Sequence, residues 1–75
     1  MMSDMKRVEL LRRIARAARG RDMAWELERE GASHELWSLD GELVTIPRHR
    51  EIDERTARGI LRALELKLGK DWWRR

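Results

Sequence analysis

The sequence GASHELWSLDGELVTIPRH, residues 31–49, decides the fold of this chain. Two apolar runs, 34–39 and 42–46, flank the dipeptide Asp40-Gly41, and such a dipeptide between two candidate strands favours a two-residue β-turn. Pro47 ends the second run because proline has no N–H to donate to a neighbouring strand. The stretch therefore predicts a β-hairpin.

On the N-terminal side of this hairpin, residues 6–19 repeat with the spacing of a helix. Their apolar side chains fall on one face, and their arginines lie on the other. Ser3 or Asp4 is expected to cap the start of this helix, and Gly20 to stop it.

Between this helix and the hairpin, Trp25 and Leu27 alternate with polar residues, which predicts a further half-buried strand before a turn at 30–32. On the C-terminal side, Asp53 is expected to be the N-cap of a second helix. The apolar stripe of that helix runs to Leu68, where the next residue is a glycine.

The predicted order is helix, three-stranded meander, helix, within a single domain spanning residues 1–75. Both helices need an apolar surface to cover, so we expect a small two-layer α+β domain. It has a three-stranded antiparallel sheet with both helices on one face. His34 is expected on the open face, and Trp37 on the opposite one. The core spans about residues 6–68, and 69–75 forms a basic, aromatic tail.

The composition and charge of the chain limit the classes of function that it can have. The charged and hydrophobic fractions are equal at 41%, which favours a folded domain, and no apolar run is long enough to cross a membrane. Residues 6–21 and 43–75 are basic and 22–42 are strongly acidic, so the net charge of +3 conceals a polarised chain. Such a chain suits an anionic ligand at one surface and a basic partner at another. With no cysteine and no signal-peptide core, we expect a cytoplasmic protein.

Two histidines are the candidate catalytic groups. Imidazole is the side chain that ordinarily titrates near neutral pH, and the chain has neither cysteine nor tyrosine. His34 and His49 lie fifteen positions apart, and neither has the spacing of a metal-binding motif. We therefore expect no metal and no cofactor.

Three pieces of sequence resemble the HicA toxins of bacterial toxin–antitoxin systems. These are the glycine loop leading into Ser33-His34, the segment Ile46-Pro47-Arg48-His49-Arg50-Glu51-Ile52, and the segment Thr56-Ala57-Arg58-Gly59-Ile60-Leu61. The resemblance covers about residues 6–66. One position departs from it, since Ala32 stands where the family often has glycine before the serine.

The resemblance implies a fold similar to that of double-stranded-RNA-binding domains. It also implies a metal-independent endoribonuclease that cuts mRNA, with His34 as the catalytic residue. The implied partner is a HicB antitoxin, which neutralises the toxin in a hetero-oligomer, whereas the toxin alone is expected to be a monomer. Cleavage would use His34 as general base or acid.

Cationic side chains are expected to contact the RNA phosphates. Arg48 and Arg50 are the first choices because guanidinium groups fork onto phosphate oxygens, and His49 is a secondary candidate. Backbone N–H groups of the turn ending at Ser33 are expected to assist. Lys6 and Arg7, at the start of the basic first helix, complete the predicted RNA-binding set. A structural role for His49, and a merely solvated helix face, are the competing interpretations.

Two other function classes fit the same residues. One is an RNA-binding module without catalysis, and the other is a protein-interaction domain. Trp72 and Trp73 lie outside the periodic helix, and three roles stay open for them: packing against the sheet, stacking on RNA bases, and anchoring a partner.

Overall fold

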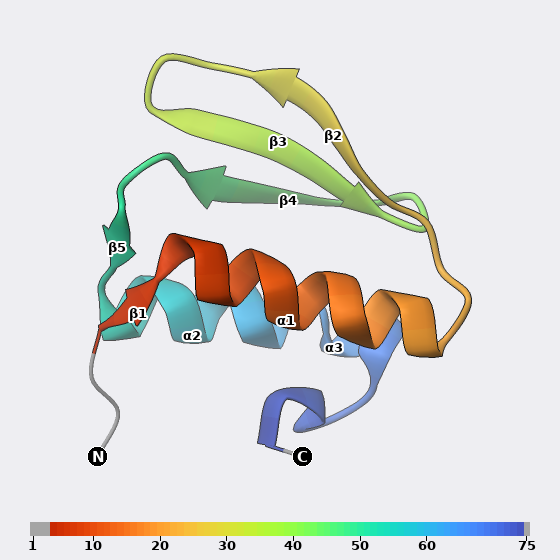
Figure 1. Ribbon diagram of the computed structural model, residues 1–75. Helices are drawn as coiled ribbons and strands as arrows, with labels where there is room; N and C mark the ends of the chain where they lie inside the picture. The colour runs from red at the N-terminus through yellow and green to blue at the C-terminus, as the bar shows by residue number, and fades with distance from the viewer. Residues whose placement is uncertain (1–3, 75) are drawn as a thin grey trace.

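The computed structural model describes residues 4–74 (Figure 1). Its elements are, in order, β1 (Met5–Lys6), α1 (Arg7–Gly20), β2 (Trp25–Glu30), β3 (His34–Leu39), β4 (Glu42–Pro47), β5 (Glu51–Ile52), α2 (Glu54–Ala63), α3 (Glu65–Leu68) and the short 3₁₀ helix η1 (Trp72–Arg74). The predicted order of a helix, three strands and a C-terminal helix is confirmed.

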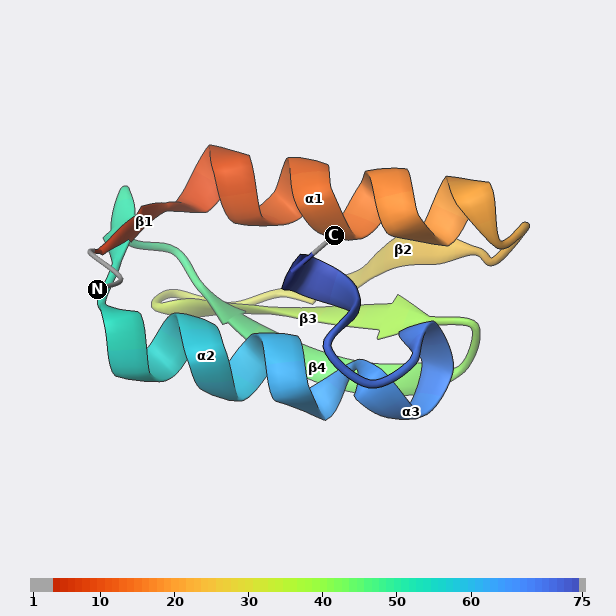
Figure 2. The ribbon, with the colours of Figure 1, turned by 90° about the horizontal axis from the view of Figure 1, so that it is seen from below.

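A three-stranded antiparallel sheet forms one layer and the helices form the other. The strand order is β2-β3-β4, so β3 is the central strand. Figures 1 and 2 show α1 and α2 side by side on the same side of this sheet, with the other side uncovered. The hydrophobic core is built from residues of α1, the strands and the C-terminal segment: Leu10, Ile14, Ala18, Leu39, Val44, Ile46, Ile52, Ala57, Ile60, Leu61, Leu64, Leu68 and Trp72.

The β3–β4 hairpin forms as its sequence predicts. Asp40 and Gly41 both have positive φ angles, 51° and 94°, which is the requirement for the type I′ turn that matches the twist of two strands. The register pairs Leu39 with Glu42 next to the turn, and His34 with Pro47 at the far end. The hairpin thereby places the end of β4 directly beside the start of β3.

Alternation along β3 separates its side chains between the two faces of the sheet. Trp37 is half-buried on the helix-facing side, where its ring stacks on Trp25 with the centroids 4.6 Å apart and the planes at 14°. His34 is three positions away and therefore belongs to the uncovered face, where it is exposed. Both placements agree with the sequence prediction.

The start of α1 differs from the prediction. Its N-cap is Lys6, with no side-chain hydrogen bond to the first turn. Asp4 does not cap this helix; its Oδ1 instead accepts a hydrogen bond from the backbone N–H of Glu54, at 3.3 Å. Ser3, the other expected cap, lies outside the described residues. The Asp4 carboxylate thus accepts a hydrogen bond at the N-terminus of α2, a helix that begins fifty positions later in the chain.

The N-terminus of α2 is capped as expected. Asp53 accepts a hydrogen bond from the backbone N–H of Thr56, at 3.2 Å. Hydrogen bonds from the hydroxyl and the backbone N–H of Thr56 hold the pKa of the Asp53 carboxyl below its ordinary value. This cap fixes the point at which the chain leaves the sheet and enters the helix layer.

The second helix is not continuous to Leu68 as the apolar stripe predicts. It breaks at Leu64, which has φ −90° and ψ 0°, and resumes as α3. Leu64 is fully buried, and Leu68 nearly so. Both residues therefore stay in the core although the helix is interrupted between them.

Two further contacts connect parts of the chain that are distant in the sequence: a short ladder between β1 and β5, and the packing of Trp72. Met5 pairs with Ile52 and Lys6 with Glu51, so β1 and β5 form a small antiparallel ladder. At the C-terminus, Trp72 is 6% exposed, and its Nε1 donates to the carbonyl of Leu61 at 2.9 Å. Trp72 thus folds back to become part of the core. None of the helices in the described part of the chain is both long and apolar enough to cross a membrane.

Candidate nucleic-acid interface

All seven residues predicted to act on RNA lie at one end of the domain, the end that carries β1 and β5 (Figure 1). Backbone hydrogen bonds join their segments: the N–H of Arg7 donates to Arg50 at 2.9 Å, and that of Arg48 donates to Ser33 at 2.9 Å. The β3–β4 register places His34 beside the same segments. We call this set the basic end: Lys6, Arg7, Ser33, His34, Arg48, His49 and Arg50.

His34 begins the central strand. Its carbonyl accepts a hydrogen bond from the N–H of Gly31, at 2.8 Å, so the backbone is held on both sides of the β2–β3 turn. Its side chain is exposed, and within residues 4–74 the imidazole has no hydrogen-bond partner. A ring in this position is accessible to an anionic ligand.

The turn before His34 depends on a glycine. A Cβ at Gly31 would lie 2.9 Å from the carbonyl oxygen of His34, closer than carbon and oxygen tolerate. Ala32, where the family resemblance is broken, does not have a positive φ, so alanine is not strained there. The close backbone approach at this turn is made by Gly31.

Arg48 holds this turn from the β4 side. Its Nη1 donates to the carbonyl of Gly31 at 2.7 Å, and its side chain remains 44% exposed. The guanidinium therefore ties the end of β4 to the turn that carries Ser33, while part of it still faces solvent. Such an arginine can position the loop and contact a phosphate at the same time.

Glu35 is the residue of this region that sequence reasoning missed. Its side chain is only 12% exposed, forms an ion pair with Arg7, and accepts a hydrogen bond from Nε1 of Trp37 at 3.0 Å. The Nε of Arg48 lies 4.0 Å from its other oxygen. The alternation along β3 could have indicated this cluster. It places Glu35 on the same face as Trp37, and a carboxylate that is largely removed from water needs a cation beside it.

The cations of the basic end therefore differ in what they already contact. Arg7 is bound within the fold, since it also donates from Nε to the carbonyl of Pro47 at 2.9 Å. Lys6, His49 and Arg50 are exposed, and their side chains have no ion pair or hydrogen bond among residues 4–74. These three groups, with part of Arg48, are the ones available to an incoming anion.

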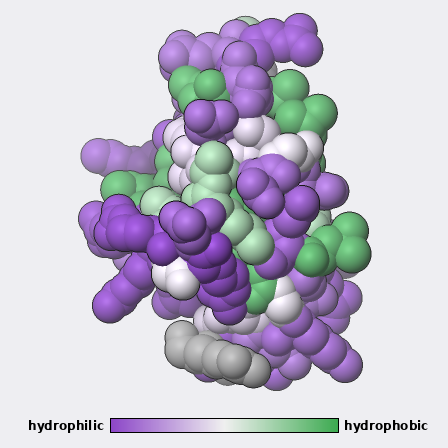
Figure 3. All heavy atoms as spheres, turned by 90° about the vertical axis from the view of Figure 1, so that its right-hand side faces the viewer, coloured by the Kyte–Doolittle hydropathy of each residue, from purple (hydrophilic) through white to green (hydrophobic). Residues whose placement is uncertain are grey.

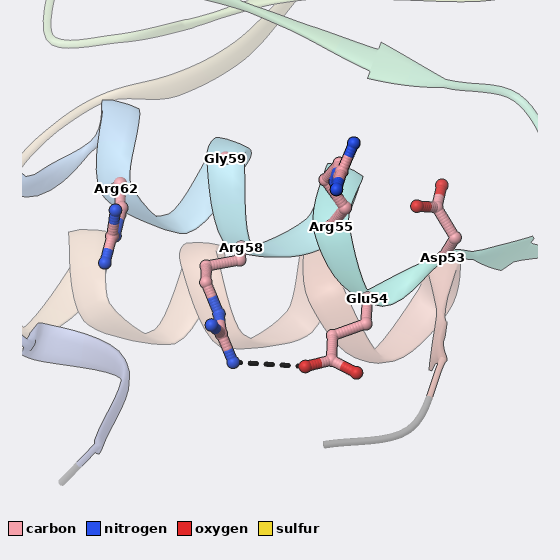
Figure 4. Close-up of a pocket in the computed structure, with 6 residues that line it drawn as sticks. All are labelled: Asp53, Glu54, Arg55, Arg58, Gly59 and Arg62. Atoms are coloured by element: carbon pink, nitrogen blue, oxygen red, sulfur yellow. Dashed lines mark hydrogen bonds and ion pairs between the residues drawn. The ribbon is translucent and has the colours of Figure 1, made fainter. Parts of the chain in front are cut away.

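A separate hollow of about 580 Å³ runs along the exposed side of α2. Figure 4 shows its arginine side chains in a row along the helix, with Arg58 paired to Glu54 at 3.1 Å. Its lining carries charges of both signs: Asp53, Glu54, Arg55, Arg58, Gly59 and Arg62. Arginines balanced by neighbouring carboxylates present a weaker attraction for anions than the basic end does.

The opposite end of the domain has a different surface. Figure 3 views the end that carries the α1–β2 connection and the β3–β4 turn, where polar side chains surround small, separate apolar areas. In residues 4–74, no three histidine, aspartate, glutamate or cysteine side chains lie together in an arrangement that would hold a metal ion.

Comparisons of the chain with protein-family models, with curated proteins and with solved structures gave no match.

Proposed function

We propose that this protein is a HicA-like toxin, a metal-independent endoribonuclease that cleaves mRNA in the cytoplasm. The observation that carries the proposal is the position of His34. Its imidazole is exposed on the uncovered sheet face and has no partner among residues 4–74, and Lys6, His49 and Arg50, which are likewise exposed and unpaired within these residues, lie at the same end of the domain. The helix–sheet–helix order, with both helices on one face, supports a fold similar to double-stranded-RNA-binding domains.

The chemistry follows from these groups. His34 takes the proton from a ribose 2′-hydroxyl, and the 2′-oxygen attacks the adjacent phosphorus while the bond to the 5′-oxygen breaks. The products are a 2′,3′-cyclic phosphate and a free 5′-hydroxyl, which receives its proton from the imidazolium or from water. Arg48 and Arg50 stabilise the charge that develops on the phosphate oxygens, and the backbone near Ser33 helps to orient it.

The partner in this proposal is a HicB-like antitoxin. The toxin alone would be a monomer, and the antitoxin would form a hetero-oligomer with it by covering the basic end. Carboxylates of the antitoxin would compete with RNA phosphates for the same free cations.

A cleavage assay with two histidine variants tests the proposal. Wild type, His34→Ala and His49→Ala are each incubated with labelled RNA in EDTA, and the products are resolved by length. We expect wild type to cleave, His49→Ala to cleave with a weakened affinity for RNA, and His34→Ala to lose activity by about 100-fold or more. Circular dichroism checks that each variant is folded. Equal cleavage by His34→Ala and wild type would remove His34 from the mechanism.

A second function is favoured by one observation. Among residues 4–74, no carboxylate or other group orients the His34 imidazole, as catalytic histidines usually require. An RNA-binding module without catalysis has no need of such a group. It would bind RNA with a steep dependence on salt concentration and leave the RNA intact in the same assay.

A further inference from the structure

A second basic surface lies on the side of the helices that faces away from the sheet. Figure 2 shows η1 against this side, next to α1, and a groove of about 550 Å³ separates the two elements. Its lining consists of Arg13, Arg16, Ala17, Arg21, Trp72, Trp73 and Arg74. We call it the α1–η1 groove. The groove shares no residue with the basic end, and His34 lies on the opposite, uncovered face of the sheet.

The aromatic wall of the groove is held in place by the core. Trp72 is buried and bonded to the carbonyl of Leu61, and the ring of Trp73 meets it edge-to-face at 6.2 Å and 86°. Trp73 itself is only half-buried, and the guanidinium of Arg74 lies 5.9 Å from its ring centroid. Because Trp72 anchors η1, the indole of Trp73 is presented to the groove in a fixed position.

The lining is positive, with no carboxylate of its own. Arg16 is exposed, and its side chain has no ion pair or hydrogen bond within residues 4–74. Arg13 and Arg74 pair at the surface with Glu9 (3.2 Å) and Asp71 (3.6 Å), both outside the lining. Exposed pairs of this kind contribute little to stability, so a phosphate can replace them at small cost.

Arginines beside a fixed indole match two parts of a nucleotide. Guanidinium groups bind phosphate oxygens in a fork, and an indole ring stacks on a base. The volume of the groove falls within the range of small-ligand sites. An acidic protein segment would satisfy the arginines alone, whereas a nucleotide also uses the ring of Trp73.

We propose that the α1–η1 groove binds a nucleotide of single-stranded RNA, with its phosphate on Arg16 and neighbouring arginines and its base on Trp73. The identification of RNA as the ligand rests on the proposed function. In that setting the groove holds a part of the substrate distant from the bond that is cut, and it increases affinity without taking part in the reaction.

Binding of a fluorescent 2′-O-methyl-uridine octamer tests the groove, because this probe has no free 2′-hydroxyl and stays intact whether or not the protein is a ribonuclease. Fluorescence anisotropy gives its Kd for wild type, Arg16→Gln, Trp73→Leu and the control Arg19→Gln. Arg19 is also an exposed arginine of α1 but does not line the groove. We expect Trp73→Leu and Arg16→Gln to weaken binding about tenfold, and Arg19→Gln less than about twofold.

Two competitors identify the ligand class. An abasic octamer of equal charge is expected to bind about tenfold more weakly than the uridine octamer, since it cannot stack. A glutamate octapeptide is expected to compete poorly. Equal Kd values for Arg16→Gln and Arg19→Gln would overturn the site, as would equal binding of the abasic octamer. Strong competition by the peptide would overturn RNA in favour of an acidic protein.

The two proposals fail in different ways. If the groove is correct and the ribonuclease is not, wild type binds the octamer through Trp73 but cuts no RNA. If the ribonuclease is correct and the groove is not, His34→Ala still abolishes cleavage while Trp73→Leu leaves the octamer Kd unchanged.

Discussion

The carboxylate of Glu35 lies against the guanidinium of Arg7, beneath the sheet, while its neighbour His34 occupies the opposite face. The pair joins β3 to the first turn of α1, and the same carboxylate accepts a hydrogen bond from Trp37. One partly buried charge therefore connects the first helix to the strand that begins with the proposed catalytic residue.

Glu35→Gln removes this charge and leaves Arg7 without its partner in a largely buried position. We expect the free energy of unfolding to fall by about 2 kcal/mol, because breaking a partly buried pair leaves Arg7 as an ion that is partly desolvated and has lost its counter-charge. Thermal unfolding measures the change. Glu9→Gln is the control, since its pairs with Arg12 and Arg13 are exposed and should contribute less than about 1 kcal/mol. Equal effects of the two variants would contradict a structural role for Glu35.

Gly31→Ala tests the close approach at the β2–β3 turn. The new Cβ would meet the carbonyl oxygen of His34 at 2.9 Å, so the backbone must shift, and we expect a loss of about 1–3 kcal/mol in stability. Gly59→Ala is the matched variant, because Gly59 is inside α2 with no atom within 4 Å of its added Cβ. There alanine should stabilise the helix by about 0.5–1 kcal/mol. Denaturant unfolding distinguishes the two, and a stabilised Gly31→Ala would rule out the tight turn.

Asp53 makes part of the stability dependent on pH. Its pKa is lower in the folded protein than in the unfolded chain, so its ionised form stabilises the fold above the ordinary aspartate pKa of about 3.9. This contribution is lost as the pH falls through the lower folded value. We therefore expect Asp53→Ala to reduce the melting temperature at pH 7, and the difference from wild type to shrink below about pH 4.

Asp53→Asn separates the cap from the charge. Asparagine caps helices as well as aspartate does but does not titrate, so its stability relative to wild type should increase as the pH falls. A constant difference between pH 7 and pH 2.5 would show that the Asp53 carboxyl does not gain from its hydrogen bonds with Thr56.

Trp72 makes the C-terminal segment part of the core. Trp72→Ala should destabilise the domain by about 3–5 kcal/mol, because it removes a large buried ring. Trp72→Phe keeps most of the apolar contact but loses the hydrogen bond to Leu61, and should cost about 1–3 kcal/mol. Chemical denaturation gives both values, and an unchanged stability of Trp72→Ala would mean that the segment is dispensable for folding.

The parts of the fold that could be predicted are those set by neighbours in the sequence. The Asp40-Gly41 turn, the alternation of His34 and Trp37, and the Asp53 cap each depend on a few adjacent residues. The features that could not be predicted depend on contacts between residues that are far apart in the sequence. The β1–β5 ladder could not be predicted because a strand of two residues is too short to show an alternating pattern. The hydrogen bond between Asp4 and Glu54 joins residues fifty positions apart, which the local sequence does not indicate.

The same distinction applies to the candidate site. His34 and the exposed cations could be chosen from residue type and from the family resemblance. Arg7 is bound within the fold, whereas the side chain of Arg50 has no partner among residues 4–74, and this difference depends on where Glu35 and Pro47 lie in space. The apolar stripe likewise gives no signal for the break at Leu64, because the side chains on both sides of the break remain apolar at helical spacing.

The β1–β5 ladder has a consequence for how the protein is made. It joins Met5 to Ile52, and Arg7 reaches the carbonyl of Pro47, forty positions along the chain. A ribosome that has released only the first helix and the hairpin has not yet supplied the strand that closes the basic end. Because contacts between residues so distant in the sequence require a long loop to close, the surface proposed to engage RNA cannot be completed before residues 47–52 have been synthesised. A truncated translation product that stops before residue 50 would lack this surface.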